Sequence, residues 1–386
     1  MKILHICLAN FYIDNYSYQE NMLPKFHKEL GLDVEIIASL VSFDNTGKSC
    51  LLENGGSYVN EYDIPVTRLE YKKNKFSKRL RQYEGTYEAI KKANPDIIFV
   101  HGCQFLDIKY VVKYVESNTD VKIYVDNHAD FSNSATNWLS KNALHKIIWR
   151  YCAKLIEPYT EKFYGVLPSR VDFLEDIYKV PENKTELLLM GADDDKVIEA
   201  KKDGVKQDIR NKFGISSSDF LIMTGGKIDL AKKQTLLLMK AIKEIENAHV
   251  KLIVFGSVVD ELKDKVKALQ ECNKVQYIGW ISSEETYKYF GAADLVIFPG
   301  RHSVFWEQVV GLGIPMLVKY WEGTTHVDVG GNCKFIYKDS VEEIKKGIED
   351  LVENSEEYKK MVSISKRCRE LFLYSATAKR SIELNS

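Results

Sequence analysis

Short apolar and β-branched runs alternate along the whole chain with amphipathic segments rich in lysine and glutamate. A strand followed by a helix, repeated many times, is typical of βαβ units and a parallel sheet. Strands that are apolar throughout fit a sheet covered by helices on both faces. We therefore expect an α/β fold of Rossmann-like sheets. Its predicted strands are Ile3–Cys7, Val34–Ala38, Ile97–His101, Lys122–Asp126, Gly165–Pro168, Leu187–Met190, Phe220–Thr224, Lys251–Phe255, Val275–Ile278, Leu295–Phe298 and Met316–Lys319.

The chain has 386 residues, which is too long for one compact core. A polar stretch separates the first six predicted strands from the last five. We expect an N-terminal Rossmann-like domain at 1–192, a linker at 193–212 and a second Rossmann-like domain at 213–365. The remaining residues, 366–386, are expected to form a C-terminal helix that packs back on the N-terminal domain.

The composition excludes several classes of protein. A formal net charge of −1 provides no basic field for a nucleic-acid partner. No stretch approaches the roughly 20 apolar residues of a membrane-spanning helix, and the first apolar run is too short for a signal peptide. The seven cysteines are scattered without a CxxC pair, which argues against a zinc site or a disulfide framework. A reducing cytoplasm is therefore the expected location.

Polar and glycine residues follow the predicted strands, where open α/β sheets bind their ligands. The most informative stretch is Thr224–Gln234, in which Gly225 and Gly226 precede two lysines, Lys227 and Lys232. Paired glycines allow a tight turn close to a ligand, and the ammonium groups and exposed amides suit a diphosphate. An ordinary strand–helix loop with solvated lysines is the alternative.

A second stretch, Pro299–Pro315, contains a short loop and then a buried helix that begins near Trp306. Glu307 lies in the first turn of this otherwise apolar helix. The helix dipole favours a carboxylate there, so a structural role is one interpretation. A carboxylate is equally suited to accept hydrogen bonds from ribose or sugar hydroxyls, which is the functional interpretation.

Gly226-Lys227 followed by Lys232 resembles the Gly-Arg…Lys-Gly signature of the family 4 retaining glycosyltransferases. The resemblance implies the GT-B fold, in which two Rossmann-like domains face each other across a cleft. It also implies that Lys227 and Lys232 hold the diphosphate of a nucleotide-sugar donor. The resemblance covers nearly the whole second domain and, more loosely, the first. Further matching positions are Asp194, Gly256, Gly279, Glu284, Glu285, Ala293, Asp294, Gly313, Ile314 and Pro315.

One departure from this family concerns its pair of glutamates, which are eight positions apart. The second glutamate position falls on Gln308, beside Glu307, and the first glutamate is absent from a region that contains His302 and Ser303. The string from His302 to Gln308, with Tyr18-Gln19-Glu20-Asn21 near the start, resembles a subset of bacterial surface-polysaccharide transferases. Either Glu307 or Gln308 is then the residue that contacts the ribose.

In the first domain, His128 resembles the family's strand-end histidine that approaches the donor sugar. A histidine satisfied within its own strand end is the alternative. The loop that begins at Asn10 is expected on the acceptor side of the cleft, together with Tyr18, Asn21 and His101.

The resemblance implies transfer of a sugar, with retention, from a UDP- or GDP-linked donor to a glycan or lipid-linked acceptor in cell-surface polysaccharide synthesis. No metal is expected. Lys227 and Lys232 are catalytic candidates because preorganised charge stabilises the leaving diphosphate. His128 is the third, because its imidazole can accept from a sugar hydroxyl or stabilise charge near the anomeric carbon. Two other functions remain open. One is a sugar-nucleotide 2-epimerase of the same fold, and the other is a non-catalytic sugar-nucleotide-binding partner of a transferase.

Two charged segments have alternative interpretations. Asp193-Asp194-Asp195 fits helix capping or solvated linker better than a metal site. The basic segment 71–81 is either a solvated helix or a peripheral contact with an anionic membrane surface or a lipid-diphosphate acceptor.

Overall fold

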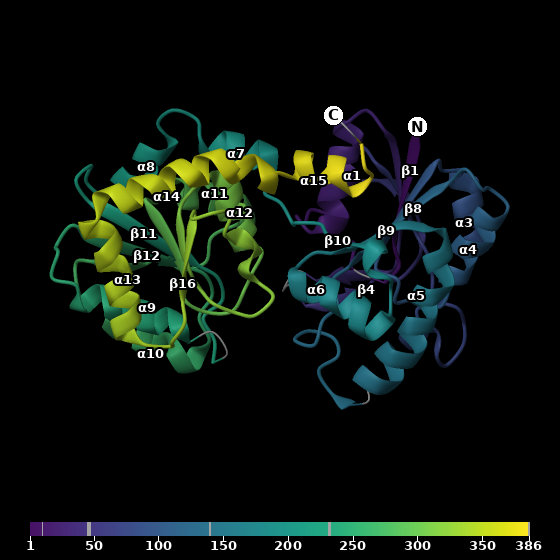
Figure 1. Cartoon of the computed structure of the whole chain (residues 1–386), viewed down its shortest axis with the longest axis horizontal. Helices are drawn as coiled ribbons and strands as arrows, with labels where there is room; N and C mark the ends of the chain where they lie inside the picture. Colours follow the sequence, from purple (N-terminus) through teal and green to yellow (C-terminus); the bar gives the residue numbers. More distant parts are fainter. Residues whose placement is uncertain (10, 45–47, 139, 231–232, 385–386) are drawn as a thin grey trace. The chain divides into compact units, whose positions relative to one another are not determined.

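The computed structural model describes residues 1–9, 11–44, 48–138, 140–230 and 233–384. The chain forms two compact units. Unit 1 comprises Met1–Leu189 and Tyr374–Ser386, and unit 2 comprises Met190–Leu373. Each unit is a sheet with helices on both faces (Figure 1), as the sequence predicts for a doubly wound fold.

The sheet of unit 1 has the strand order β10-β9-β8-β7-β1-β2-β6-β5. All neighbouring strands are parallel except β5 and β6. The strands are β1 (Lys2–Cys7), β2 (Asp33–Ala38), β5 (Gly56–Val59), β6 (Pro65–Arg68), β7 (Ile97–His101), β8 (Lys122–Asn127), β9 (Thr160–Gly165) and β10 (Thr185–Leu187), with a separate hairpin of β3 (Val41–Phe43) and β4 (Ser49–Leu51).

The helices of unit 1 pack on this sheet. They are α1 (Gln19–Glu29), α2 (Ser77–Leu80), α3 (Thr86–Ala93), α4 (Ile108–Glu116), α5 (Arg150–Ile156), α6 (Pro168–Phe173) and α15 (Tyr374–Ser381), with π-helical segments at Ser140–Trp149 and Leu174–Tyr178.

Unit 2 contains an all-parallel sheet with the order β13-β12-β11-β14-β15-β16. Its strands are β11 (Phe220–Gly225), β12 (Val250–Phe255), β13 (Val275–Tyr277), β14 (Leu295–Phe298), β15 (Met316–Lys319) and β16 (Cys333–Ile336). Its helices are α7 (Asp194–Ala200), α8 (Val205–Lys212), α9 (Gln234–Glu244), α10 (Asp260–Leu269), α11 (Ser283–Ala292), α12 (Phe305–Leu312), α13 (Val341–Glu353) and α14 (Ser355–Cys368).

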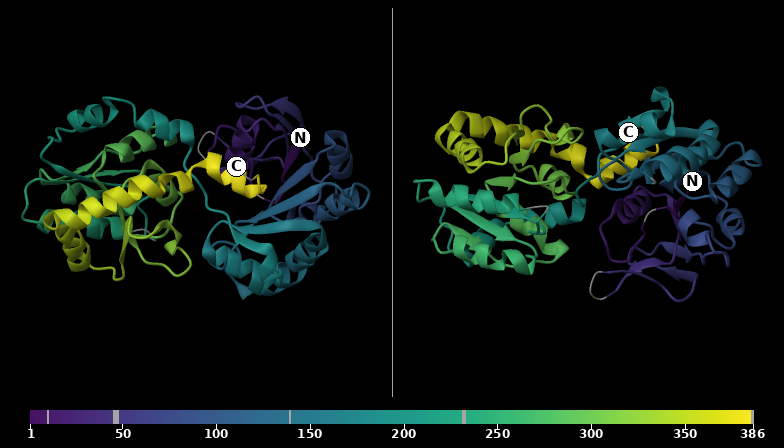
Figure 2. Two further views of the ribbon diagram at one scale, coloured as in Figure 1. Left: turned by 45° about the horizontal axis from the view of Figure 1, so that its top comes forward. Right: turned by 90° about the horizontal axis from the view of Figure 1, so that it is seen from below.

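The last helix, α15, belongs to unit 1, where it lies against α1 (Figures 1 and 2). The rings of Tyr374 and Phe26 stack with their centroids 6.1 Å apart, and the Thr377 hydroxyl donates to the Leu189 carbonyl at 3.2 Å. Residues 366–373, which the sequence assigns to the same C-terminal element, belong to unit 2 instead.

The structure corrects the predicted linker. Residues 193–212 form α7 and α8 and are part of unit 2, and the chain passes from unit 1 to unit 2 after Leu189. Asp193 caps α7 by accepting from the Asp195 amide at 3.2 Å, so capping is confirmed for the acidic triplet.

Two strand predictions also need correction. Leu187–Met190 shares only Leu187 with β10, which spans Thr185–Leu187. The predicted strand Gly165–Pro168 lies too far along the chain, because β9 ends at Gly165 and Pro168 begins α6. The sequence analysis did not predict β3, β4, β5, β6 or β16. The first four lie between β2 and α2, where a helix was expected to follow the strand directly. Among the described residues, no helix combines the length and the hydropathy that crossing a bilayer requires.

Candidate functional site

A pocket of about 270 Å³ lies in unit 2, where β11 and β14 end side by side. The strand order reverses at this pair, so the pocket is at the topological switch point at which open α/β sheets bind ligands. Its lining residues are Thr224, Gly225, Gly226, Lys227, Thr235, Phe298, Pro299, Gly300, Arg301, Ser303, Val304 and Phe305.

Two helices begin at the pocket wall. Thr235 is in the first turn of α9, and Phe305 is the first residue of α12. Helix N-termini carry amide groups without intrahelical partners and a partial positive charge. The wall therefore favours an anionic ligand, and phosphate groups are the usual ligands of such ends.

Lys227 and Arg301 supply the cationic side chains of this pocket. The Lys227 side chain is 60% exposed, and its Nζ lies 3.6 Å from the Asp229 carboxylate. The sequence prediction omitted Arg301 and Thr235 as ligand contacts, although Arg301 directly follows the strand end at Phe298–Gly300. Lys232 lies outside the described residues.

The glycine loop is held by backbone contacts. The Gly226 N–H donates to the Phe255 carbonyl at 3.1 Å, so this amide is not available to a phosphate, contrary to the sequence prediction. Gly256 has φ +126°, and a Cβ there would lie 1.9 Å from the Gly226 carbonyl oxygen. Gly256 does not line the pocket. Its lack of a side chain instead allows the two loops to approach each other.

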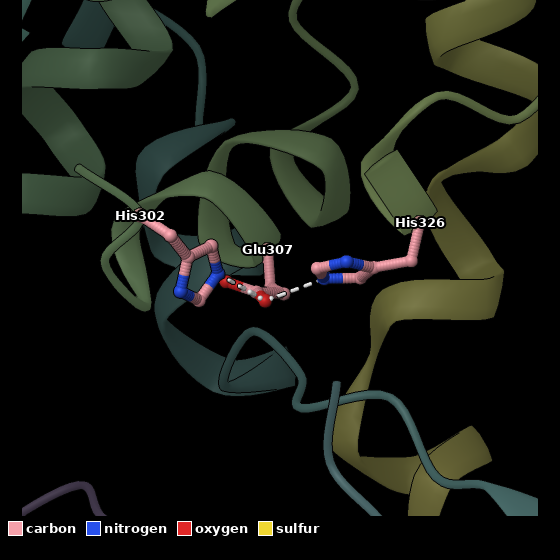
Figure 3. Close-up of side chains that lie close together, drawn as sticks. All are labelled: His302, Glu307 and His326. Atoms are coloured by element: carbon pink, nitrogen blue, oxygen red, sulfur yellow. Dashed lines mark hydrogen bonds and ion pairs between the residues drawn. The ribbon is translucent and has the colours of Figure 1, made fainter. Parts of the chain in front are cut away.

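Next to the pocket, two histidines share one carboxylate oxygen (Figure 3). His302 Nε2 and His326 Nε2 each lie 2.8 Å from Glu307 Oε1. Glu307 is fully buried. Burial alone raises the pKa of a carboxyl, but His302 and His326 outweigh this effect and hold the Glu307 pKa well below its usual range. His302 is partly exposed and is followed by Ser303, which lines the pocket.

Neither Glu307 nor Gln308 lines the pocket. Glu307 Oε2 and Gln308 Oε1 are buried and have no hydrogen-bond partner among the described residues. The Oε1 atom of Glu307 is already occupied by two imidazoles. His326 is also part of this cluster, although the sequence pointed only to the loop that contains it.

The spacing of His302, Glu307 and His326 raises the question of a metal ion, since one ligand atom from each lies within 4.8 Å of the others. The hydrogen bonding does not fit one. Each Nε2 lies within hydrogen-bond distance of the same carboxylate oxygen, and a tautomer that donates there has no Nε2 lone pair for a metal. His326 Nδ1 is buried without a partner among the described residues, whereas a metal-bound histidine usually donates its other N–H.

In unit 1, His128 follows β8 and is partly exposed. Its Nε2 lies 3.3 Å from Asp126 Oδ2 and 4.0 Å from Glu20 Oε1. Burial lowers the pKa of His128, but the carboxylates of Asp126 and Glu20 outweigh it, so the pKa is raised. His128 is thus an imidazole with a strong tendency to become cationic.

The residues predicted on the acceptor side do not form one surface. Tyr18 is exposed, whereas Asn21 and His101 are buried. Asn21 Nδ2 donates to the Ile13 carbonyl at 2.9 Å, and His101 Nδ1 lies 2.8 Å from Asp126 Oδ2. These two side chains serve internal contacts, so the prediction that they meet an acceptor is wrong. Asn10 lies outside the described residues.

Comparisons with known proteins match most of unit 2 by sequence and the whole chain by fold. Residues 205–367 match the family model of the glycosyl transferases group 1, and this range lies within unit 2. The mannosylfructose-phosphate synthase of Agrobacterium fabrum is 26% identical over 170 residues. That alignment covers 41% of this chain, and the chain spans only about a third (35%) of that relative's length.

Solved structures resemble the whole chain, among them two with a bound nucleotide or nucleotide sugar. The Anabaena protein HepE in complex with UDP is 15% identical with a TM-score of 0.66, and the match covers 99% of both chains. The UDP-GlcNAc 2-epimerase of Neisseria meningitidis bound to UDP-GlcNAc is 12% identical with a TM-score of 0.63, again over 99% of both chains. The fold is therefore that of GT-B proteins. It is shared by an epimerase, so the fold does not by itself decide the reaction.

Proposed function

We propose that this chain is a glycosyltransferase that moves a sugar, with retention at the anomeric carbon, from a nucleoside-diphosphate donor to a hydroxyl of an acceptor. The observation that carries the proposal is the pocket of unit 2. It lies at the switch point of the sheet, is lined by Lys227 and Arg301, borders two helix N-termini and falls within the region matched to group 1 glycosyltransferases.

In this proposal the donor diphosphate occupies the pocket. Lys227 and Arg301 face its oxygens, and the family resemblance assigns Lys232 to the same diphosphate. Negative charge develops on the diphosphate as the sugar leaves, so fixed positive charge stabilises the transition state more than the ground state. The leaving phosphate itself accepts the proton of the incoming hydroxyl, because no nucleophilic carboxylate lines the pocket among the described residues.

The buried cluster beside the pocket then orients the part of the donor next to the diphosphate. Glu307 binds His302 and His326, so we assign it a positioning role. His302 and Ser303 contact the sugar in place of the family's missing glutamate. Gln308, whose Oε1 has no partner among the described residues, contacts the ribose after a small movement of its side chain.

In the first unit, His128 approaches the anomeric centre and stabilises charge there. Tyr18 is the exposed candidate for contact with the acceptor. By its resemblance to surface-polysaccharide transferases, the chain acts in the cytoplasm on a glycan or lipid-linked acceptor, without a metal. The segment 71–81 forms only one short helical turn, α2, and its exposed Lys73, Lys75, Lys78 and Arg79 would contact an anionic membrane surface.

The test is turnover of a panel of UDP- and GDP-linked sugars by the full chain, with and without glycan and lipid-linked acceptors. We expect release of free nucleoside diphosphate that an acceptor stimulates, and a product whose anomeric configuration by proton NMR equals that of the donor. An inverted product would refute retention. A C2 epimer formed without an acceptor would identify an epimerase, and donor binding without turnover of any donor would identify a non-catalytic partner.

A further inference from the structure

The part of unit 1 between β8 and β9 presents large apolar side chains to solvent. Trp138 is 77% exposed, Ile147 is 66% exposed and Tyr151 is 60% exposed. Single exposed apolar residues are ordinary in proteins, but several on one helical segment mark a surface that another molecule covers. We call Trp138, Ile147 and Tyr151 the exposed apolar face.

These three residues lie along one helical segment. The π-helical residues Ser140–Trp149 continue directly into α5. Ile147 and Tyr151 are four residues apart, so they lie on the same side of the segment. Trp138 lies at its N-terminal end, where Asn142 Nδ2 donates to the Trp138 carbonyl at 3.0 Å.

The opposite side of the segment packs against the rest of unit 1. Trp149 and His145 are buried, and His145 Nδ1 lies 2.8 Å from the Tyr178 hydroxyl. A helix that faces water usually turns polar residues outward, whereas this one turns Ile147 and Tyr151 outward. The outward side is therefore suited to an apolar environment.

The charge around the exposed apolar face is positive. The sequence from 131 to 156 has no aspartate or glutamate, and its basic residues are Lys141, Lys146, Arg150 and Lys154. The carboxylates at its two ends already have cationic partners. Asp130 Oδ2 lies 3.1 Å from Arg170 Nε, and the Glu157 carboxylate lies 3.0 Å from Lys154 Nζ and 3.5 Å from Lys184 Nζ. This part of unit 1 therefore attracts an anionic surface.

The basic segment 71–81 adjoins the same helical segment. The Arg81 guanidinium carbon lies 5.5 Å from the centroid of the Trp149 ring. Segment 71–81 also lacks acidic residues, and Phe76 is exposed on it. Its exposed cations are Lys73, Lys75, Lys78 and Arg79. Two neighbouring segments of unit 1 thus combine exposed apolar side chains with positive charge.

A bilayer that contains anionic lipids fits this chemistry. Tryptophan and tyrosine favour membrane–water interfaces, because each ring has an apolar body and a polar end. Lysine and arginine extend from an interfacial helix towards the lipid phosphates. Each such residue near an anionic leaflet increases the partition coefficient by about fivefold.

We propose that the exposed apolar face inserts into the interfacial layer of an anionic bilayer, with the surrounding lysines and arginines on the lipid phosphates. Trp138, Ile147 and Tyr151 are then the membrane anchor, and segment 71–81 supplies additional charge. The inference rests on the membrane contact in the proposed function, but not on sugar transfer.

The experiment is flotation of the full chain with vesicles of phosphatidylcholine, either alone or mixed with phosphatidylglycerol, without nucleotide or sugar. We expect binding to the anionic vesicles and not to the neutral ones. Most of this binding should be lost in about 1 M salt, where the screening length is only about 3 Å.

Two substitutions in the exposed apolar face have matched controls in unit 2. Trp138→Ala and Ile147→Ala should each weaken binding to anionic vesicles by about tenfold, because each removes a large apolar side chain from the lipid. Trp280→Ala and Ile198→Ala remove the same residue types at 73% and 62% exposure and should leave binding unchanged. All four side chains are exposed, so no core is disturbed.

Brominated acyl chains locate the anchor, because they quench a tryptophan only where it enters the bilayer. We expect quenching in the wild type and in Trp280→Phe, and its loss in Trp138→Phe. The last variant should still bind the vesicles, since its ring remains apolar.

Three results would overturn the proposal. They are no binding of the wild type to anionic vesicles, equal binding to neutral vesicles, and equal effects of Trp138→Ala and Trp280→Ala. A chain that transfers sugar but binds no vesicles would refute this inference alone. A chain that binds anionic vesicles but turns over no donor would refute the proposed sugar transfer alone.

Discussion

Glu307 shows how a single buried charge is accommodated. It has no solvent contact and lies in the first turn of α12, where the helix dipole favours a carboxylate. Two imidazole N–H groups converge on one of its oxygens. Hydrogen bonds from such groups compensate for the loss of hydration, and removal of the charge weakens both of them because neither is then charge-assisted.

Replacement of this carboxylate in Glu307→Gln is expected to lower the free energy of unfolding by about 2 kcal/mol at pH 7. The pKa of Glu307 is depressed in the folded state, so its stabilisation is complete above the unfolded-state pKa of about 4.3 and is lost as the pH falls below it. The difference between wild type and variant should therefore shrink below about pH 4.

Urea unfolding at several pH values measures this difference. The matched control is Glu284→Gln, which changes an exposed glutamate in the first turn of α11. It is expected to lower the free energy of unfolding by less than about 0.5 kcal/mol. Equal effects of the two substitutions at pH 7 would show that the histidines do not depend on the Glu307 charge.

At the residue scale the sequence indicated where charges gather but not what each atom contacts. Lys227 was predicted in the phosphate loop, and it lines the pocket. The Gly226 amide donates to the Phe255 carbonyl, and His326 contacts the Glu307 carboxylate. Both hydrogen bonds join residues that are far apart in the chain. A pattern of residue types carries no information about such pairings.

At the scale of elements, two glycine loops support the pocket. The end of β11 and the end of β12 approach so closely that a Cβ on Gly256 would meet the Gly226 backbone. Gly256→Ala is expected to lower the free energy of unfolding by about 3 kcal/mol, because both the positive φ and the clash disfavour the new side chain. Affinity for a nucleoside diphosphate should fall as well, because Lys227 follows the displaced loop.

Urea unfolding and nucleotide titration of the same variant test this expectation. Gly291→Ala in α11 is the control, because its Cβ would lie 3.4 Å from the nearest atom, the Ala200 carbonyl oxygen, and would favour the helix. Wild-type stability and affinity in Gly256→Ala would show that the close approach of the loops is not required.

Element predictions succeeded where burial was complete. The central strands β1, β7, β11, β12 and β14 are almost wholly buried, so their apolar runs were recognisable in the sequence. β5 is exposed along its length and gave no such signal. α8 buries only Arg210 among its residues, so this surface helix has the polarity of a linker and was predicted as one.

At the scale of the whole molecule, the chain crosses from unit 1 to unit 2 after Leu189 and returns after Leu373. The returning segment completes unit 1, because Tyr374, Ala378 and Ile382 are buried in its core. Each unit nevertheless has its own sheet and its own hydrophobic cluster. Damage to one core should therefore leave the other folded.

Ala378→Asp places a carboxylate at a fully buried position of unit 1 and is expected to destabilise that unit by about 3–5 kcal/mol. Nucleoside-diphosphate affinity should stay within about twofold of wild type, because the pocket belongs to unit 2. Lys379→Asp, which changes an exposed residue of the same helix, is the control. Loss of nucleotide binding in Ala378→Asp would show that the two units do not fold independently.

The proposal that unit 2 holds the donor through Lys227 and Arg301 is tested most directly by calorimetric titration of the full chain with UDP and GDP. Hydrogen bonds to charged groups contribute about 1.5–3 kcal/mol, so Lys227→Ala and Arg301→Ala should each weaken binding by about tenfold or more. Lys267→Ala, an exposed lysine on α10 away from the pocket, should leave the affinity unchanged. Wild-type affinity in both pocket variants, or no binding of either nucleotide by the wild type, would refute the proposed donor site.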